Sequence, residues 1–363
     1  MKTRYQVLDG LRGTAALGVV AFHLWELMVP GLDYNPMPHT FLAVDFFFTL
    51  SGFVLGYAYD GRLARGADPR MALGFWDFIK RRLIRLHPVV IVAASIGLAT
   101  YLLDPNVGTK QTVGVALSAD KLMLIFALSL FLLPAPPLPN DFGETHAINP
   151  PSWTLFWEYV ANLFFVSYGH RMKRPLHIAI MVAGAAGLLL TAHFYKGDLG
   201  YGWGWDNVWV APIRLIYPFL AGLLVYRLGW KIKMPAPYLT ASLILLAVFL
   251  APRMGWYNGV FEAACVIFVF PLVVMIGASV DTITGPLAPL CRFAGAVSYP
   301  LYIVHYPFTY MFGHWDWSTH PDKPHLYAVA VGVFAFQLGL GTLLLYAYDR
   351  PVRAWLSKRY LKP

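Results

Sequence analysis

Residues 11–29 decide the fold: they read LRGTAALGVVAFHLWELMV, an almost uninterrupted apolar run with one arginine, one histidine and one glutamate. A helix rises about 1.5 Å per residue, so a run of this length covers the roughly 30 Å hydrocarbon core of a bilayer. The run therefore predicts a transmembrane helix that carries ionisable side chains.

Similar runs continue along the chain, which is 58% hydrophobic, only 13% charged and has a mean hydropathy of +0.55. They lie near residues 40–60, 88–104, 152–170, 176–195, 208–226, 237–251, 257–278, 294–314 and 326–348. Open-chain segments in lipid must be helical, because each backbone group needs a partner within the segment. The sequence predicts an all-α polytopic membrane protein with about ten transmembrane helices, forming one membrane domain over residues 1–363.

The basic residues assign the two sides of the membrane. They concentrate at the N-terminus, in 61–87, 171–174 and 227–233, and in the basic tail 350–363, whereas 30–39 and 134–151 hold no Lys or Arg. By the positive-inside rule these basic segments and both termini are cytoplasmic. The formal charge of +9 then reflects contact with anionic membrane lipids rather than nucleic acid, and we expect a bacterial cytoplasmic (inner) membrane.

Two segments need separate treatment. The short run 121–133 ends at Pro134, and counting it as a full span would put the basic 171–174 segment outside. It is therefore predicted to be re-entrant or interfacial, with eleven spans as the alternative. Residues 75–86, FWDFIKRRLIRL, predict a basic amphipathic helix on the cytoplasmic surface.

Ionisable residues inside spans are costly and indicate functional sites. Arg12 and His23 are eleven residues apart, which places them on one helix face about 16 Å apart. Counted from the predicted span ends, six residues fall in one layer roughly 8–12 Å below the outer surface. These are His23, Asp45, Glu158, Arg214, Glu262 and His305.

This composition suits acyl transfer. A neutral imidazole can take the proton from a hydroxyl, a carboxylate can orient the imidazole, and an arginine can hold an oxyanion. The alternative for Asp45, Arg214 and Glu262 is a set of buried salt bridges that fix helix packing. The basic helix also has two interpretations, since Arg82 and Arg85 can contact lipid phosphates or grip a nucleotide phosphate.

Several motifs, taken together and in order, resemble those of the acyltransferase-3 family, membrane O-acyltransferases of bacterial glycans and some small molecules. The opening LDGLRGTAALGVVAFH holds Arg12 and His23, and VDFFFTLSGFVLGY holds Ser51. RRLIRLHP holds Arg81, Arg82 and Arg85. SWTLFWE, with Trp153 and Glu158, RLIYPFLAG, VSYPLYIVHYP and DRPVR follow.

The resemblance implies that acetyl-CoA or a related acyl-CoA enters from the cytoplasm as a co-substrate, with no tightly bound cofactor and no metal. It makes Arg12 and His23 the functional pair and places Arg81, Arg82 and Arg85 at the CoA phosphates. The acceptor is expected to be an extracytoplasmic glycan or lipid-linked sugar. Members often carry an extracytoplasmic hydrolase-like domain. We expect a stand-alone form here, or one served by a separate extracytoplasmic transferase partner.

In the predicted mechanism, His23 either accepts the acyl group or acts as general base, oriented by Asp45 or Glu158. His305 is a second base, or else a hydrogen-bond partner of Tyr299 or Tyr302. Arg214 is a further catalytic candidate. The substrate-contact candidates are Ser51, Trp153, Glu262, Tyr299, Trp203 and Trp205. The two tryptophans lie in a Gly-rich outer loop, where they either stack on a sugar ring or belong to an interfacial aromatic belt.

Two other functional classes remain open from sequence. A proton-coupled transporter could use the same His and carboxylate layer, although no internal repeat is evident. A non-catalytic subunit that binds lipid or polyprenyl-linked sugar is the third.

Overall fold

The computed structural model describes residues 5–29, 31–64, 72–106, 117–138, 142–195 and 197–361. Within these ranges the chain is helical, and β-structure is limited to one bridge between Glu144 and Gly204. In this described part of the chain, eight helical stretches are long and apolar enough to cross a membrane, and α9 is a shorter apolar helix. The predicted all-α polytopic fold is confirmed.

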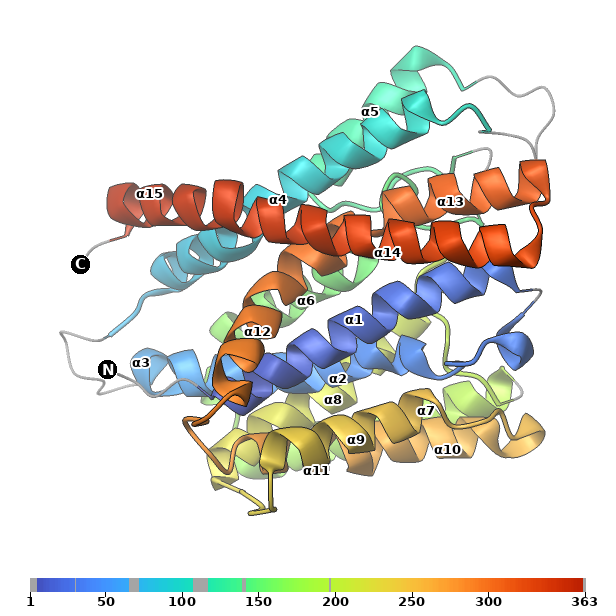
Figure 1. The fold of residues 1–363 in the computed structure, drawn as a ribbon. Helices are drawn as coiled ribbons and strands as arrows, with labels where there is room; N and C mark the ends of the chain where they lie inside the picture. Colours follow the sequence, from blue (N-terminus) through green and yellow to red (C-terminus); the bar gives the residue numbers. More distant parts are fainter. Residues whose placement is uncertain are drawn as a thin grey trace.

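The helices follow one another as an up-and-down bundle (Figure 1). The first half contains α1 (Gln6–Met28), α2 (Ala43–Leu55) with η3 (Gly56–Asp60) and α3 (Gly61–Leu63), α4 (Phe75–Leu103), α5 (Ala119–Leu130), α6 (Ser152–Ser167) and α7 (Arg174–Phe194). The second half contains α8 (Val210–Leu228), α9 (Pro237–Phe249), α10 (Asn258–Ala264), η6 (Cys265–Val269), α11 (Phe270–Gly277), α12 (Leu287–Val304), α13 (Tyr306–Thr319), α14 (Lys323–Leu344), η7 (Leu345–Asp349) and α15 (Arg350–Tyr360). Short 3-10 turns, η1 (Leu32–Tyr34), η2 (Thr40–Leu42), η4 (Gly169–Arg171) and η5 (Gly255–Tyr257), lie in the connections.

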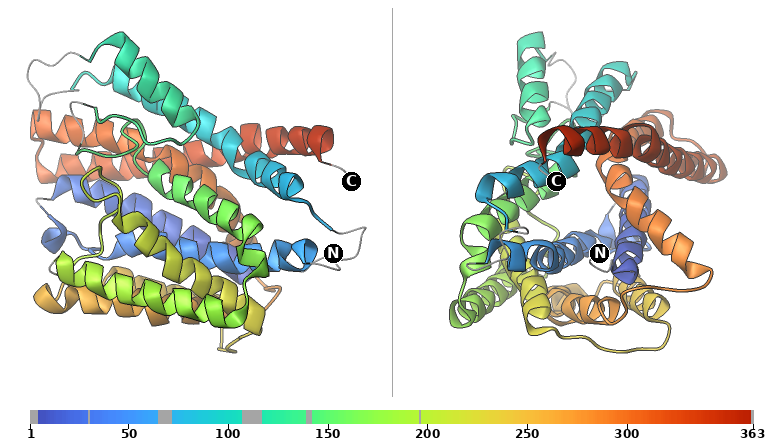
Figure 2. Two further views of the ribbon diagram at one scale, coloured as in Figure 1. Left: turned by 180° about the vertical axis from the view of Figure 1, so that it is seen from behind. Right: turned by 90° about the vertical axis from the view of Figure 1, so that its left-hand side faces the viewer.

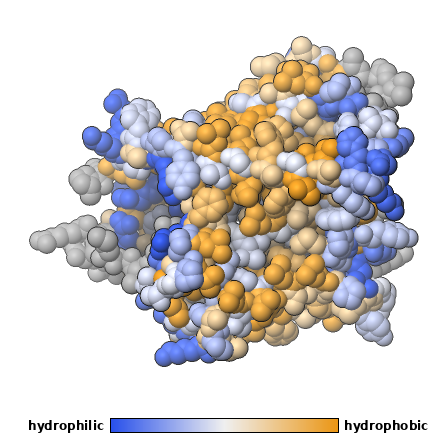
Figure 3. Space-filling model, viewed as in Figure 1, coloured by the Kyte–Doolittle hydropathy of each residue, from blue (hydrophilic) through white to orange (hydrophobic). Residues whose placement is uncertain are grey.

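The bundle has two polar ends and an apolar middle. Both chain ends lie at the same end of the bundle, together with α3 and α15 (Figure 1), and an apolar band separates this end from the other (Figure 3). We call it the basic end, because Arg62, Arg227 and Arg353 lie there, and the other the opposite end. This arrangement is that of a multi-pass membrane protein.

Two predicted boundaries differ from the structure. The amphipathic helix predicted over 75–86 and the span predicted from residue 88 form one continuous helix, α4, with Pro88 inside it. Packed membrane helices tolerate proline because neighbouring groups satisfy the freed backbone positions. As a consequence Arg82 is 5% exposed and faces the bundle instead of lying on a surface. The span predicted over 294–314 is divided at His305 into α12 and α13.

The segment 121–133 does not cross. Helix α5 ends at Leu130, and the following chain binds the α7–α8 loop, with Ala135 N donating to Thr145 O at 2.8 Å and Thr145 N donating to Trp203 O at 2.9 Å. Helix α6 then runs toward the basic end (Figure 2). The re-entrant interpretation, with α6 completing the crossing, is therefore the one that the structure shows.

Small residues allow the helices around the cavity to pack closely. A Cβ on Gly52 would collide with the Phe219 carbonyl, and one on Gly222 with the Thr49 carbonyl, so α2 and α8 are in backbone contact. Gly13 and Gly295 do the same between α1 and α12. Close approach through small residues is the usual basis of helix association in lipid. It brings the Arg12 side chain to α12.

Candidate active site

A cavity of about 920 Å³ opens at the basic end and is lined by α1, α2 to α3, α4, α6, α12 and η7 to α15. Its size is at the upper end of the roughly 300–1,000 Å³ found for small-molecule sites. Among the described residues, the lining contains seven arginines, Arg12, Arg62, Arg81, Arg82, Arg85, Arg350 and Arg353, against three carboxylates, Asp9, Glu158 and Asp349. The excess of four positive charges fits a polyanionic ligand.

Several of these arginines are held by protein groups. Arg12 donates from Nε to Ser298 Oγ at 2.8 Å and also to the Gly295 carbonyl, while Arg82 donates to Glu158 Oε1 at 2.6 Å. In the part of the chain that the structure describes, Arg85 makes no hydrogen bond or ion pair, although it is half-buried between these groups. A half-buried guanidinium without a counter-charge is costly unless a ligand supplies one. Within the described residues Arg81 makes no hydrogen bond or ion pair either, and its buried Nε has no partner. Arg81 and Arg85 are therefore the strongest candidates for contact with a phosphate.

The cavity follows most of α2. Its lining runs from Arg62 at the basic end through Ser51 to Val44 in the first turn of α2. At about 1.5 Å per residue this is roughly 27 Å, close to the thickness of the hydrocarbon core. A ligand that enters at the basic end can thus extend nearly across the bundle.

His23 lies toward the opposite end. Its Nδ1 is 2.8 Å from Glu26 Oε2, its ring stacks on that of His305 at 5.5 Å between centroids, and Tyr306 meets it edge-on at 4.8 Å. The side chains of His23 and Glu26 are 21% and 37% exposed. A carboxylate that holds one imidazole nitrogen leaves the other to take a proton, which is the arrangement of a general base.

His23 does not line the cavity. Tyr302 is the last residue of α12 that reaches the lining, its ring is 6.0 Å from that of His305, and His305 in turn covers His23. The sequence places Arg12 and His23 on one helix face, and in the structure these two rings lie between the cavity at Arg12 and His23. The closure arises where α12 ends and α13 begins, a break that the predicted single span did not include.

His305 itself has an unusual environment. Its Nδ1 is 2.8 Å from the Tyr302 carbonyl, so Nδ1 carries the proton and Nε2 is the free acceptor. That Nε2 atom is buried and, within the described residues, has no hydrogen-bond partner. Gln337 fixes the backbone of the break by donating to the His305 carbonyl at 2.9 Å. The structure therefore places a second imidazole with a free nitrogen between the cavity and His23.

The predicted six-residue layer is divided into separate groups. Arg214 forms a buried two-contact ion pair with Asp45, at 3.2 and 2.5 Å, and also binds the carbonyls of Tyr201 and Phe41. Glu262 accepts from Leu199 N at 2.7 Å and from Asn258. For Asp45 and Arg214 this geometry is that of the salt-bridge alternative, whereas Glu262 is held by hydrogen bonds.

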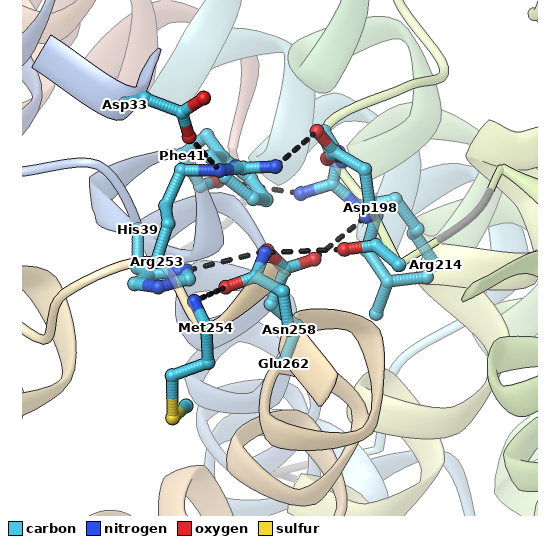
Figure 4. Close-up of polar contacts among 12 residues, drawn as sticks. Asp33, His39, Phe41, Asp198, Arg214, Arg253, Met254, Asn258 and Glu262 are labelled. Atoms are coloured by element: carbon cyan, nitrogen blue, oxygen red, sulfur yellow. Dashed lines mark hydrogen bonds and ion pairs between the residues drawn. The ribbon is translucent and has the colours of Figure 1, made fainter. Parts of the chain in front are cut away.

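Figure 4 shows the Glu262 group with its neighbours His39, Asp198, Arg253 and Asp33. Arg253 joins Asp33 at 3.1 Å and Asp198 at 3.2 Å. The group therefore ties the loops of the opposite end to one another. Glu158 belongs neither to the Glu262 group nor to the Asp45–Arg214 pair, because it lies in the cavity and is paired with Arg82.

The remaining predicted residues divide in the same way. Ser51 and Tyr299 line the cavity, and Trp153 packs under the Arg214 guanidinium at 5.7 Å. Trp203 donates to Gly200 O within its own loop, whereas Trp205 donates to Ala135 O and is 47% exposed. Of the two tryptophans, Trp205 is the one whose ring is open at the opposite end.

Glu26 and Thr154 were not predicted as site residues, and Tyr302 was predicted only as a hydrogen-bond partner of His305. Glu26 was detectable, since a His-x-x-Glu spacing on a helix puts both side chains on one face. Thr154 and Tyr302 carry no ionisable group at neutral pH, and their pairing at 3.0 Å joins helices that are far apart in sequence. No local pattern indicates that contact.

Residues 5–344 match the family model described as an acyltransferase domain, the acyltransferase-3 model. The chain belongs to the acyltransferase-3 family. It is therefore a membrane O-acyltransferase. Of the three functional classes that the sequence left open, this is the enzyme.

Curated relatives of this acyltransferase agree with that assignment. A Streptomyces mycarofaciens protein named acyltransferase MdmB is 26% identical over 98% of the chain and 93% of its own length. Protein 2 in the picA locus of Rhizobium radiobacter is 33% identical over 52% of the chain and 95% of its own length. A Staphylococcus aureus protein with the provisional name O-acetyltransferase is 26% identical over 84% of the chain. The match covers about half (51%) of that relative's own length. No solved structure gives a significant match.

Proposed function

We propose that this O-acyltransferase takes an acyl group from cytoplasmic acyl-CoA, acetyl-CoA in the first instance, and transfers it to a hydroxyl of an extracytoplasmic carbohydrate. The observation that carries the proposal is the arginine-lined cavity, which begins at the basic end and extends roughly 27 Å toward His23. CoA combines phosphates with a long flexible arm, and the cavity offers guanidinium groups from its mouth inward together with apolar side chains along α2. Arg12, Arg81, Arg82 and Arg85 are the proposed phosphate contacts.

In this mechanism the acceptor approaches from the opposite end. His23 Nε2 takes the proton of the acceptor hydroxyl while the oxygen attacks the thioester carbonyl. The carbon–sulfur bond breaks, and the CoA thiolate leaves with the proton that His23 returns. Glu26, through its bond to Nδ1, orients His23 and stabilises the imidazolium that forms. The His305 ring must move aside for the two substrates to meet.

The test uses membranes that contain the full chain and labelled acetyl-CoA, followed by extraction of glycans and lipids. His23→Ala should abolish transfer of label. Arg85→Gln should raise the KM for acetyl-CoA about 10- to 100-fold, since a charge-assisted hydrogen bond is worth about 1.5–3 kcal/mol. Arg359→Gln, which removes a charge from α15 outside the cavity lining, is the matched control and should leave the KM unchanged. Label transfer that survives His23→Ala, or a KM indifferent to Arg85, would contradict the proposal.

Orientation is tested by labelling of single introduced cysteines. Both native cysteines, Cys265 and Cys291, are buried, so an introduced thiol is the one that reacts. A cysteine at Asp322, at the opposite end, should react with an impermeant maleimide in intact cells, and one at Lys358 should react only after lysis. The reverse pattern would place the cavity mouth outside and exclude a cytoplasmic donor.

A further inference from the structure

The inner end of the cavity is built where three helices end. The first turn of α2 supplies Val44 and Phe47, the first turn of α6 supplies Thr154, and the last turn of α12 supplies Tyr302. All four line the cavity at the point farthest from Arg62 and Arg353. A thioester whose nucleotide lies at the arginines reaches this end first.

Two hydroxyls form the polar part of this end. Thr154 Oγ1 donates its proton to Pro151 O at 2.9 Å. The Tyr302 hydroxyl lies 3.0 Å from Thr154 Oγ1 and is therefore the donor in that hydrogen bond. The residues are 6% and 7% exposed, so the pair is nearly dry. A hydroxyl in such a setting is a strong donor for a carbonyl oxygen that gains negative charge. The Tyr302 proton has only to turn from Thr154 to a bound thioester.

The apolar part is a wall of packed rings. Phe47 meets the Tyr302 ring edge-on at 5.6 Å and contacts Phe46 at 6.1 Å. Behind Tyr302 lies His305, which is completely buried. An acyl chain that extends past the thioester runs into this wall, so the end accommodates few carbon atoms.

The charges at this end also limit the acyl group. Arg214, which lies over Trp153 next to Thr154, is already neutralised by Asp45 and bonded to two carbonyls. Arg12 is held one helical turn before Tyr302 by Ser298 and Gly295. A carboxylated acyl group such as succinyl would therefore be desolvated here without a counter-charge, which disfavours its binding.

We propose that this end of the cavity is the acyl subsite, that it selects acetyl or a similarly short uncharged group, and that Phe47 sets the chain length while Tyr302 binds the thioester carbonyl. The proposal rests on the proposed function, because it assigns the far end of the donor cavity. Phe47 is thereby a specificity-determining residue, and Tyr302 is a residue that touches the reacting carbonyl.

The chain-length test compares acetyl-, butyryl- and hexanoyl-CoA as donors for the wild type and Phe47→Ala. Loss of the phenyl ring makes room for several methylenes, whose burial is favourable, so the hexanoyl-to-acetyl ratio of kcat/KM should rise at least about tenfold. The control is Phe308→Ala, which removes the α13 ring of a different aromatic pair, Phe308 with Phe336, and should leave the ratio unchanged. Phe47→Leu gives a smaller change in the same direction if the alanine variant folds poorly. A wild type that uses all three donors equally, or a ratio indifferent to Phe47, overturns the proposal.

The carbonyl test uses Tyr302→Phe, which removes one oxygen. The kcat for acetyl transfer should fall about 10- to 100-fold with little change in KM, because the hydroxyl acts on charge that develops during the reaction. Tyr217→Phe, which loses a phenol bonded to Ile267 O outside the cavity, is the control. If Arg85→Gln raises the KM but Phe47 and Tyr302 variants behave as wild type, the subsite is refuted and the proposed function stands. If none of the variants alters use of acyl-CoA, the donor cavity itself is refuted.

Discussion

The pairing of Glu26 with His23 leads to the sharpest prediction about the opposite end of the bundle. Replacing Glu26 by Gln keeps the length and shape of the side chain but removes the charge that His23 Nδ1 contacts at 2.8 Å. The amide oxygen can still accept a hydrogen bond from Nδ1, so the ring keeps its tautomer. What is lost is the electrostatic stabilisation of the imidazolium that forms during transfer.

The expected size of the effect follows from the exposure of the pair. A hydrogen bond to a charged group contributes about 1.5–3 kcal/mol when it is shielded from water. Glu26 is 37% exposed and His23 21%, so solvent screens part of this, and about 1–2 kcal/mol remains. Since about 1.4 kcal/mol corresponds to a factor of ten, kcat should fall about 5- to 30-fold. Glu26→Ala, which also frees the ring, should lower kcat further.

The assay is transfer of labelled acetyl groups in membranes, with kcat and the KM for acetyl-CoA measured separately. The KM should stay unchanged, because Glu26 lies outside the donor cavity. Asp33→Asn is the matched control, as it removes an exposed carboxylate from the same end of the bundle. A Glu26→Gln enzyme with wild-type kcat would show that His23 works without its carboxylate. A change confined to KM would place Glu26 in donor binding instead.

Three further predictions concern stability. Asp45→Asn should destabilise the fold by about 3–5 kcal/mol, seen as a lower melting temperature in detergent, and adding Arg214→Gln should recover part of the loss, because a lone buried charge costs more than a missing pair. Gly52→Ala should abolish accumulation of the folded protein in membranes, since the new Cβ would overlap the Phe219 carbonyl. Burial lowers the pKa of His146, in the loop before α6, from 6.5 to about 4. The unfolded chain therefore binds a proton that the folded one excludes, so melting temperature should fall as the pH drops from about 6.5 toward 4, and less so in His146→Gln.

Hydrophobicity and charge were sufficient to predict the bundle, but not the local breaks in its helices. The span positions and the non-crossing nature of 121–133 follow from run length and from the Arg171 to Arg174 charges. The continuity of α4 through Pro88 does not, because the rule that proline ends a helix gives way where tertiary packing satisfies the backbone. The division of α12 from α13 at His305 is likewise set by packing, with Gln337 holding the break from α14.

The depth of Glu158 shows why the predicted layer was incomplete. It was counted from an outer span boundary at residue 152, on the assumption that α6 starts at the membrane surface. In the structure the segment before α6 binds the interior, with Asn149 donating to Ile303 O at 2.7 Å, so α6 begins deeper in the bundle. Glu158 is therefore level with Arg82 in the cavity. Depth can be counted from sequence only where a helix begins at the surface.

The closed path between the cavity and His23 is what a transferase of this geometry requires. A polar cavity of roughly 27 Å that also opened at His23 would conduct water and protons across the membrane. The rings of Tyr302 and His305 separate the cavity from His23. Their backbone lies at the α12–α13 break, where Pro307 removes a helical hydrogen-bond donor. Under the proposed function, a short movement at that break is then enough to bring the thioester and the acceptor hydroxyl together, because a donor that fills the cavity extends across most of the bundle. On this argument, variants that hold the break rigid should slow transfer without weakening the binding of acyl-CoA.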